Sequence, residues 1–183
     1  MAKTIAFLTA PEGVEQVELT EPWQAVLDAG GTPQLLSTVD AGAPVQAFNH
    51  LDKGDTFTVD TPVAQAEVAD YDGLVLPGGV ANPDALRLDA AAVEFIRKWV
   101  ESAKPVAAVC HAPWTLIEAR VIEGKTLTSW PSLATDLTNA GARWVDQEVM
   151  VCPTNGWTLV SSRNPGDLPA FCRELVTAFG LRA

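Results

Sequence analysis

The chain has 183 residues, 48% of them apolar, which suits a single globular domain, residues 1–183, with a substantial buried core. It carries 23 acidic and 12 basic side chains, a formal net charge of −11, and this excess of negative charge argues against nucleic acid as a partner. Three cysteines without any Cys-x-x-Cys pair argue against a disulfide framework or a structural zinc site. We therefore expect free thiols, no metal or other cofactor, and a cytoplasmic location.

The first segment, MAKTIAFLTA, combines one lysine with a brief apolar run, and the charged stretch PEGVEQVE follows it at once. This pattern indicates a first strand at 4–10 rather than a secretory signal or a membrane span. We then expect a helix near 20–29, ending at Gly30-Gly31, and a second strand at 33–38.

Strands and helices continue to alternate through the rest of the chain. Turn residues within 41–60 predict a small hairpin at a sheet edge, and YDGLVLPGG (71–79) predicts a buried strand that ends on two glycines. Apolar residues at helical spacing over 89–103 follow Asp89, a plausible helix cap. The remaining expected elements are a strand at 105–110, a helix from about 112, a strand at 125–130, a helix at 132–140, strands near 147–152 and 157–162, and a final helix from about 166.

This alternation favours an α/β fold in which helices cover both faces of a doubly wound, mostly parallel sheet. Ligands of such sheets bind beyond the carboxyl ends of the strands. LPGG (76–79) ends one expected strand and VCHAP (109–113) ends another. Both segments are therefore expected at the same edge of the sheet.

The stretch KPVAAVCHAPWTLIEA (104–119) places Cys110 at the end of a strand and Pro113 at the first position of the following helix. Free N–H groups and the positive end of the helix dipole favour a thiolate, so this location would lower the pKa of the thiol. Cys110 is therefore a candidate nucleophile. A buried core cysteine is the alternative, because free cysteine is among the most buried residue types.

The chain contains two histidines, so an imidazole base for Cys110 must be His50 or His111. His111 is the simpler choice. His50 could line the cleft, but a histidine in a polar hairpin is more often only solvated, so we leave it out of the catalytic set. Gly79 and the backbone amide of His111 are candidate oxyanion donors, because glycine lets N–H groups approach a reacting carbonyl. A simple turn would also account for the PGG segment.

Four ordered blocks, which together span essentially the whole chain, resemble the PfpI family of intracellular cysteine proteases and stress proteins. They are LVLPGG, KPVAAVCHAPWTLIEA, LTSWPSLATDLTNAGARWVD and LVSSRNPGDLPAF. The family is related to the Parkinson's-linked deglycase and to the class I glutamine amidotransferases. The resemblance implies a flavodoxin-like three-layer sandwich, with Cys110 as the nucleophile on a strained elbow and His111 as its base.

The resemblance also implies two acidic members of the site and an assembly of at least two subunits. In the family an acid just after the PGG loop reaches the histidine across a homodimer interface, and Asp84 stands at that place. An aspartate that only caps the following turn is the alternative. Alignment on Pro22 gives Glu18 the position of the glutamate that hydrogen-bonds the nucleophilic sulfur. If it is protonated, Glu18 could donate to the thiolate, or to a sulfinate formed by oxidation.

Two features near the elbow modify these expectations. The family commonly shows Cys-His-Gly-Pro, whereas this chain has Ala112, whose methyl group could narrow the oxyanion site or disfavour a positive φ. Activity would then be reduced or redirected. The six tryptophans are expected in the core or at an interface rather than as a ligand platform, although Trp114 and Trp130 stand near the site blocks.

Taken together, the residues and the resemblance imply a stress-related, cytoplasmic cysteine hydrolase with a Cys-His-Asp triad. Its substrate would be a peptide, or a small carbonyl compound such as methylglyoxal and its adducts, with no nucleic acid or membrane partner. A glutaminase is disfavoured, because that branch takes its histidine from a later His-x-Glu segment and no histidine follows His111. The alternative is a non-catalytic redox sensor or chaperone-like stress protein that uses oxidation of Cys110. That protein would keep its function when His111 is replaced, whereas a hydrolase would lose it.

Overall fold

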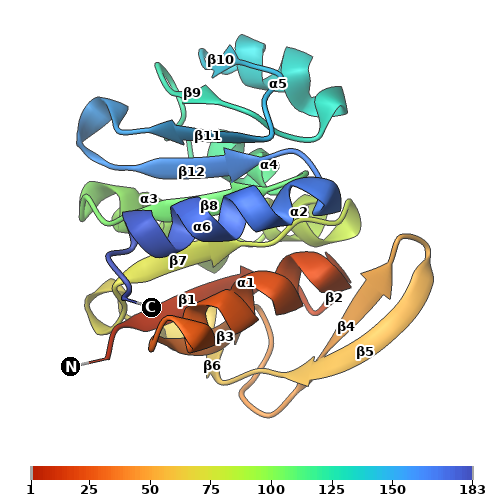
Figure 1. Ribbon diagram of the computed structural model, residues 1–183. Helices are drawn as coiled ribbons and strands as arrows, with labels where there is room; N and C mark the ends of the chain where they lie inside the picture. Colours follow the sequence, from red (N-terminus) through yellow and green to blue (C-terminus); the bar gives the residue numbers. More distant parts are fainter. Residues whose placement is uncertain (1, 183) are drawn as a thin grey trace.

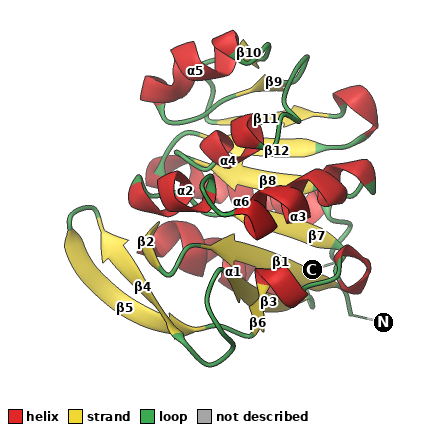
Figure 2. Cartoon of the chain, turned by 180° about the vertical axis from the view of Figure 1, so that it is seen from behind, coloured by secondary structure: helices red, strands yellow, loops and turns green. Residues whose placement is uncertain are grey.

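The computed structural model describes residues 2–182, in which helices cover both faces of a seven-stranded sheet (Figures 1 and 2). The strand order is β11-β12-β8-β7-β1-β3-β6. Neighbouring strands run parallel, except that β11 pairs antiparallel with β12 at one edge. The strands are β1 Thr4–Thr9, β3 Thr32–Ser37, β6 Thr61–Pro62, β7 Gly73–Leu76, β8 Val106–Val109, β11 Val149–Cys152 and β12 Leu159–Ser162.

The helices form two layers around this sheet. On one face α1 (Gln16–Asp28) packs beside α6 (Leu168–Ala178), and both lie in front of the sheet in Figure 1. Figure 2 shows the opposite face, covered by α2 Ala81–Leu86, α3 Ala90–Glu101 and α4 Pro113–Glu118. Short 3₁₀ turns occupy Val63–Gln65, Val68–Asp70, Pro131–Leu133, Thr154–Gly156 and Pro165–Asp167. Within residues 2–182 no helix has both the length and the apolar character needed to cross a membrane.

The interior strand β1 shows why the sheet is covered on both faces. Ile5 and Phe7 pack in the core beneath α1 and α6, whereas Ala6 and Leu8 pack in the core beneath α3 and α4. Successive side chains of a strand point to opposite faces, so a continuous apolar run contributes to both cores. Each of these four side chains is fully buried.

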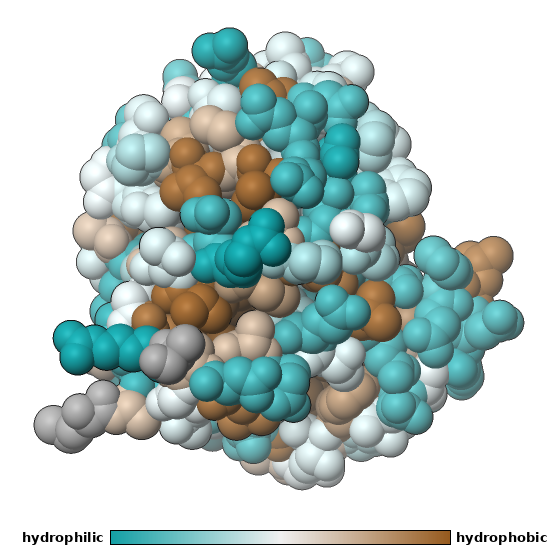
Figure 3. All heavy atoms as spheres, in the orientation of Figure 1, coloured by the Kyte–Doolittle hydropathy of each residue, from teal (hydrophilic) through white to brown (hydrophobic). Residues whose placement is uncertain are grey.

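Two smaller sheets extend from this body. The first contains β2 Glu12–Glu15, β4 Pro44–Asn49 and β5 Asp52–Thr58, and its β4–β5 hairpin projects from the body in Figure 1. Leu51, at the tip of the hairpin, is 93% exposed, and Figure 3 shows apolar surface there among hydrophilic neighbours. The second pairs β9 Thr126–Leu127 with β10 Arg143–Trp144, near α5 Ala134–Asn139.

The structure confirms the α/β class, the mostly parallel sheet and the flavodoxin-like layers predicted from the sequence. It also confirms the helix behind Asp89, whose carboxylate accepts a hydrogen bond of 2.8 Å from the N–H of Ala92. The strand predicted at 125–130 is wrong for most of its length, because only Thr126–Leu127 is extended and paired. The chain then turns at Trp130, whose N–H bonds to the carbonyl of Cys110.

Candidate active site

Cys110 lies directly after β8 in a backbone conformation that is unusual for a residue with a side chain. Its φ is +61°, in the left-handed region that costs non-glycine residues energy and is common at functional sites. Two hydrogen bonds of 3.0 Å hold this conformation: the Cys110 N–H donates to the carbonyl of Ser162, and the Cys110 carbonyl accepts from the N–H of Trp130. The elbow implied by the family resemblance is therefore present in the backbone.

His111 lies against the thiol of Cys110. Its Nδ1 is 3.1 Å from Sγ, and both residues are almost completely buried. Burial lowers the pKa of His111, because it disfavours the charged ring. The imidazole is therefore neutral at neutral pH and can accept the thiol proton at Nδ1.

Two tryptophans fix the ring of His111. Trp130 stacks on it with ring centroids 5.5 Å apart and an angle of 23°, and Trp114 packs at 5.2 Å in a tilted arrangement. The indole N–H of Trp114 donates to Asp136 at 3.0 Å, which fixes that ring in turn. Trp130 remains 39% exposed and lines the cavity in front of the thiol, so it is not a core residue of the single chain.

Glu18 reaches the same thiol from the first turn of α1. Its side chain is fully buried, and its Oε2 accepts a hydrogen bond of 3.0 Å from the N–H of Gly78. Burial raises its pKa to about 8, and the amides of Gly78 and Gly79 only partly oppose this rise. Glu18 is therefore protonated at neutral pH and is a potential donor toward sulfur. Its carboxyl group lies beside the sulfur of Cys110. The hydrogen bond to sulfur that the resemblance implies remains a prediction, since Oε1 has no hydrogen-bond partner within the described residues.

The pKa of Cys110 does not follow the expectation drawn from its position before a helix. Burial raises this pKa, and the negative charge of an ionised Glu18 would raise it further. The N–H groups of Gly79 and His111 act in the opposite direction. The helix that follows has only six residues, and the positive end of its dipole lowers the pKa of the thiol less than burial raises it. The resting pair is therefore a neutral thiol beside a neutral imidazole.

The PGG loop brings backbone N–H groups close to the sulfur because its glycines have no side chains. A Cβ on Gly78 would overlap the carboxyl group of Glu18 and the Cβ of Cys110. Gly79 has a φ of +80°, and a Cβ there would overlap the carbonyl of Gly13. The structure thus brings together Gly79 and His111, the two candidate oxyanion donors, beside Cys110.

These groups open into a cavity of about 410 Å³. The β4–β5 hairpin supplies part of its wall through Phe48, His50 and Leu51. Nothing in the sequence near the elbow indicates these residues, because only the tertiary fold brings the hairpin to the site. The other lining residues are Glu12, Gly13, Glu15, Glu18, Gly79, Val80, Ala81, Cys110, His111, Trp130 and Pro165.

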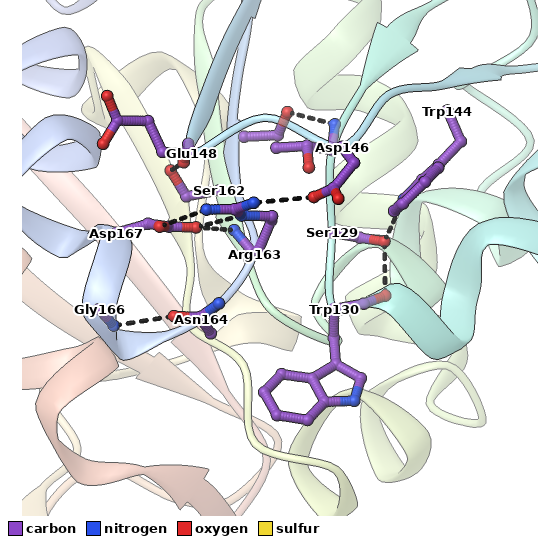
Figure 4. Close-up of polar contacts among 12 residues, drawn as sticks. Ser129, Trp130, Trp144, Asp146, Glu148, Ser162, Arg163, Asn164, Gly166 and Asp167 are labelled. Atoms are coloured by element: carbon purple, nitrogen blue, oxygen red, sulfur yellow. Dashed lines mark hydrogen bonds and ion pairs between the residues drawn. The ribbon is translucent and has the colours of Figure 1, made fainter.

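A polar network holds the two loops that carry Trp130 and Pro165 (Figure 4). Arg163 donates to Asp167 through Nε at 2.8 Å and through Nη2 at 3.0 Å, and its Nη1 donates to Asp146 at 2.8 Å. Beside it, the indole of Trp144 donates to the hydroxyl of Ser129, which donates to the carbonyl of Trp130. These bonds hold the loops that form one wall of the cavity.

Asp84 lies in the first turn of α2 with an exposed side chain. Within residues 2–182 of one chain it makes no hydrogen bond or ion pair with His111. Its side chain also accepts no hydrogen bond from the turn that follows it within the described residues, so the structure of one chain gives no support to the alternative of a turn cap. Its role as the acid supplied by a second subunit remains a prediction about a dimer.

Ala112 does not have the effect that its sequence position suggested. Its φ is −51°, so the positive φ of the elbow falls on Cys110 instead. The side chain is buried in the core beneath α3 and α4, and it does not line the cavity. The methyl group therefore does not narrow the approach to the thiol.

Comparisons with known proteins agree with this fold and site. Residues 3–178 match the model of the DJ-1/PfpI family. The chain is 41% identical over 181 residues to "Protein/nucleic acid deglycase 2" of Escherichia coli (strain K12), covering 98% of this chain and 99% of that protein. It is 37% identical over 174 residues to YraA of Bacillus subtilis (strain 168), covering 95% of this chain and 96% of that protein. YraA is named as a cysteine protease.

The solved structures include a similar fold. The crystal structure of Drosophila melanogaster DJ-1beta superposes with a TM-score of 0.83 at 28% identity, covering 99% of this chain and 91% of that one. The match to the family model and the identity to its members extend over nearly the whole length of the chain. The protein therefore belongs to the DJ-1/PfpI family.

Proposed function

We propose that this protein is a cysteine-dependent hydrolase whose substrates are methylglyoxal and its adducts or small peptides. The observation that carries the proposal is the contact of 3.1 Å between Cys110 Sγ and His111 Nδ1 at the base of an apolar-walled cavity. The deglycase and cysteine-protease names of the relatives support the same reaction class.

In the proposed reaction the neutral His111 takes the proton from Cys110 as sulfur attacks the substrate carbonyl. The carbonyl oxygen becomes negative and accepts hydrogen bonds from the N–H groups of Gly79 and His111. With an amide or ester substrate, His111 returns the proton to the leaving group, and water then cleaves the thioester. With methylglyoxal, the oxygen takes up the proton and a hemithioacetal forms.

Glu18 has a separate part in this scheme. A protonated carboxyl adds no negative charge beside the sulfur, so it does not oppose formation of the thiolate. The buried position of Glu18 supports this assignment, since burial keeps the proton on the carboxyl group. We propose Asp84 of a second subunit as the acid that orients His111 in a homodimer.

Product analysis tests the proposal. The purified protein is incubated with methylglyoxal, a methylglyoxal-modified peptide and unmodified peptides, and lactate, restored amine and cleaved peptide are quantified. Replacing Cys110 by Ser or His111 by Asn is expected to reduce turnover at least about a hundredfold. Asp84→Asn is expected to lower turnover less, and Asp40→Asn, at an exposed position that does not line the cavity, serves as an acidic control.

Two results would contradict the proposal. One is the absence of any of these products with the wild-type protein. The other is a function that His111→Asn leaves intact and Cys110→Ser abolishes, together with formation of a sulfenate or sulfinate at residue 110 under peroxide. That second pattern identifies the redox sensor instead.

A further inference from the structure

Asn82 is a fully buried polar residue of the first turn of α2, just behind the PGG loop. Its Oδ1 accepts a hydrogen bond of 2.7 Å from the N–H of Ala10, at the end of β1. Its Nδ2 donates to the carbonyls of Pro77 and Gly78, at 2.9 and 3.0 Å. One side chain therefore joins the ends of two neighbouring parallel strands at the edge where the site lies.

The peptide that Asn82 holds is part of the site. The carbonyl of Gly78 accepts from Asn82, while the N–H of Gly78 donates to Oε2 of Glu18 at 3.0 Å. The following residue, Gly79, presents its N–H to the sulfur of Cys110. Few other positions are open to this loop, since Gly79 packs directly against the carbonyl of Gly13.

We propose that Asn82 is a positioning residue that sets the direction of the Gly78 and Gly79 amides, and through them the proton on Glu18 and the oxyanion site. It touches neither Cys110 nor the cavity. A shorter side chain would release the carbonyls of Pro77 and Gly78 together, and the loop would then tilt away from Glu18. The turnover part of this inference rests on the proposed function, whereas the protonation part does not.

The experiment follows alkylation of Cys110 by iodoacetamide, resolved by peptide mass spectrometry, between pH 6 and 10. In the wild-type protein we expect the alkylation rate to rise with pH as thiolate forms. A downward step should interrupt this rise near pH 8, where Glu18 loses its proton and its negative charge opposes the thiolate. The Gly78 hydrogen bond favours the ionised carboxylate, so its loss raises the pKa of Glu18. In Asn82→Ala the step is expected at least about half a pH unit higher, with a smaller upward shift in Asn82→Ser.

Three controls separate positioning from simple loss of stability. Leu137→Ala removes a fully buried side chain of α5 and is expected to lower the melting temperature without moving the step. Glu18→Gln removes the step, and adding Asn82→Ala to it is expected to leave the rate profile unchanged. Where the wild type turns over a substrate, Asn82→Ala is expected to lower kcat about tenfold or more, with KM changed less than about threefold.

The inference is overturned if the step stays at its wild-type pH in both Asn82 variants, or if Leu137→Ala moves it equally. A change that Asn82→Ala makes in the pH dependence of alkylation in the Glu18→Gln background also overturns it, because Asn82 would then act on another group. Since alkylation needs no substrate, the pH of the step can be interpreted even if the proposed function is wrong. Conversely, normal turnover in a folded Asn82→Ala protein contradicts the inference alone.

Discussion

At the scale of single residues, the site depends on which of its three buried titratable groups hold protons. Cys110, His111 and Glu18 are all buried, so each charge among them is costly. The structure resolves this by keeping Glu18 protonated, with a pKa of about 8, and His111 neutral. Proton transfer from sulfur to imidazole then occurs as the carbonyl is attacked, and no resting thiolate is required.

Replacement of Glu18 by Gln should change how stability depends on pH. An unfolded glutamate has a pKa near 4.5 and the folded one a pKa of about 8, so the folded chain holds an extra proton between these values. Wild-type stability must therefore fall as pH rises through this window, by at most about 1.4 kcal/mol per pH unit. Glu18→Gln has no such loss, so its stability relative to the wild type should increase from pH 5 to pH 8.

Urea unfolding at several pH values measures this difference. Glu21→Gln changes an exposed glutamate of the same helix and is the matched control, for which a flat difference is expected. A pH-independent difference for Glu18→Gln as well would show that Glu18 is ionised in the folded protein and would contradict the assignment.

At the scale of elements, the elbow combines a strained residue with a short helix that is anchored in the core. Cys110 has the positive φ, and Ala112, two residues later, already has helical geometry with its methyl group in the core. Glycine, common in the family at this position, is therefore not required by the backbone here. The departure of this chain from Cys-His-Gly-Pro is a packing difference.

The variant Ala112→Gly tests this reading. It removes a buried methyl group and adds backbone freedom at the start of α4, so we expect a loss of about 1 kcal/mol in the free energy of unfolding. Turnover should stay within about twofold of the wild type, because the methyl group does not face the cavity. An increase of tenfold or more would show that Ala112 does restrict the oxyanion site.

Lys125 stabilises the edge of the sheet that β11 and β12 form. It is fully buried, and its ammonium donates to the carbonyls of Cys152, Thr154 and Trp157, the connection between β11 and β12. Lys125→Met would leave these carbonyls without a donor, so we expect a loss of roughly 2–4 kcal/mol in the free energy of unfolding. Denaturant titration measures it, with exposed Lys98→Met as control. An equally small effect of both variants would contradict this role.

At the scale of the whole molecule, the sequence pattern predicted the fold and the elbow but not the walls of the site. Apolar strand runs that alternate with helical spacing determine the sheet, and Cys110 at a strand end follows from that order. Trp130 and the β4–β5 hairpin reach the site only through contacts between distant parts of the chain. Asn82 lies near the PGG loop in sequence, but its bond to Ala10 is visible only in the fold. The direction of the pKa of Cys110 could not be predicted, because it depends on how deeply the fold buries the thiol.

The charge of the molecule should influence which reagents reach the thiol. The net charge is −11, the cavity is lined by Glu12 and Glu15, and no Lys or Arg of the described residues lines it. Neutral iodoacetamide should therefore be favoured over anionic iodoacetate at Cys110, relative to free cysteine, by about tenfold at low salt. Rate measurements with both reagents at two salt concentrations test this.

The preference for the neutral reagent should weaken at high salt and in the Glu12→Gln/Glu15→Gln double variant. Glu101→Gln/Glu174→Gln changes the net charge equally at positions that do not line this cavity, and it is the control. The same ratio at Cys110 as for free cysteine would show that the local carboxylates have no influence on access.

Trapping the covalent intermediate is the most direct test that sulfur attacks a carbonyl with the help of the adjacent imidazole. The protein in excess is mixed with methylglyoxal, quenched with acid during the first turnover, and digested with pepsin at low pH for mass spectrometry. We predict an adduct on the peptide that contains Cys110. In the wild-type protein it should form at least as fast as the turnover, and in His111→Asn it should form much more slowly. Turnover of methylglyoxal without any adduct at Cys110, or undiminished turnover by Cys110→Ser, would contradict the account.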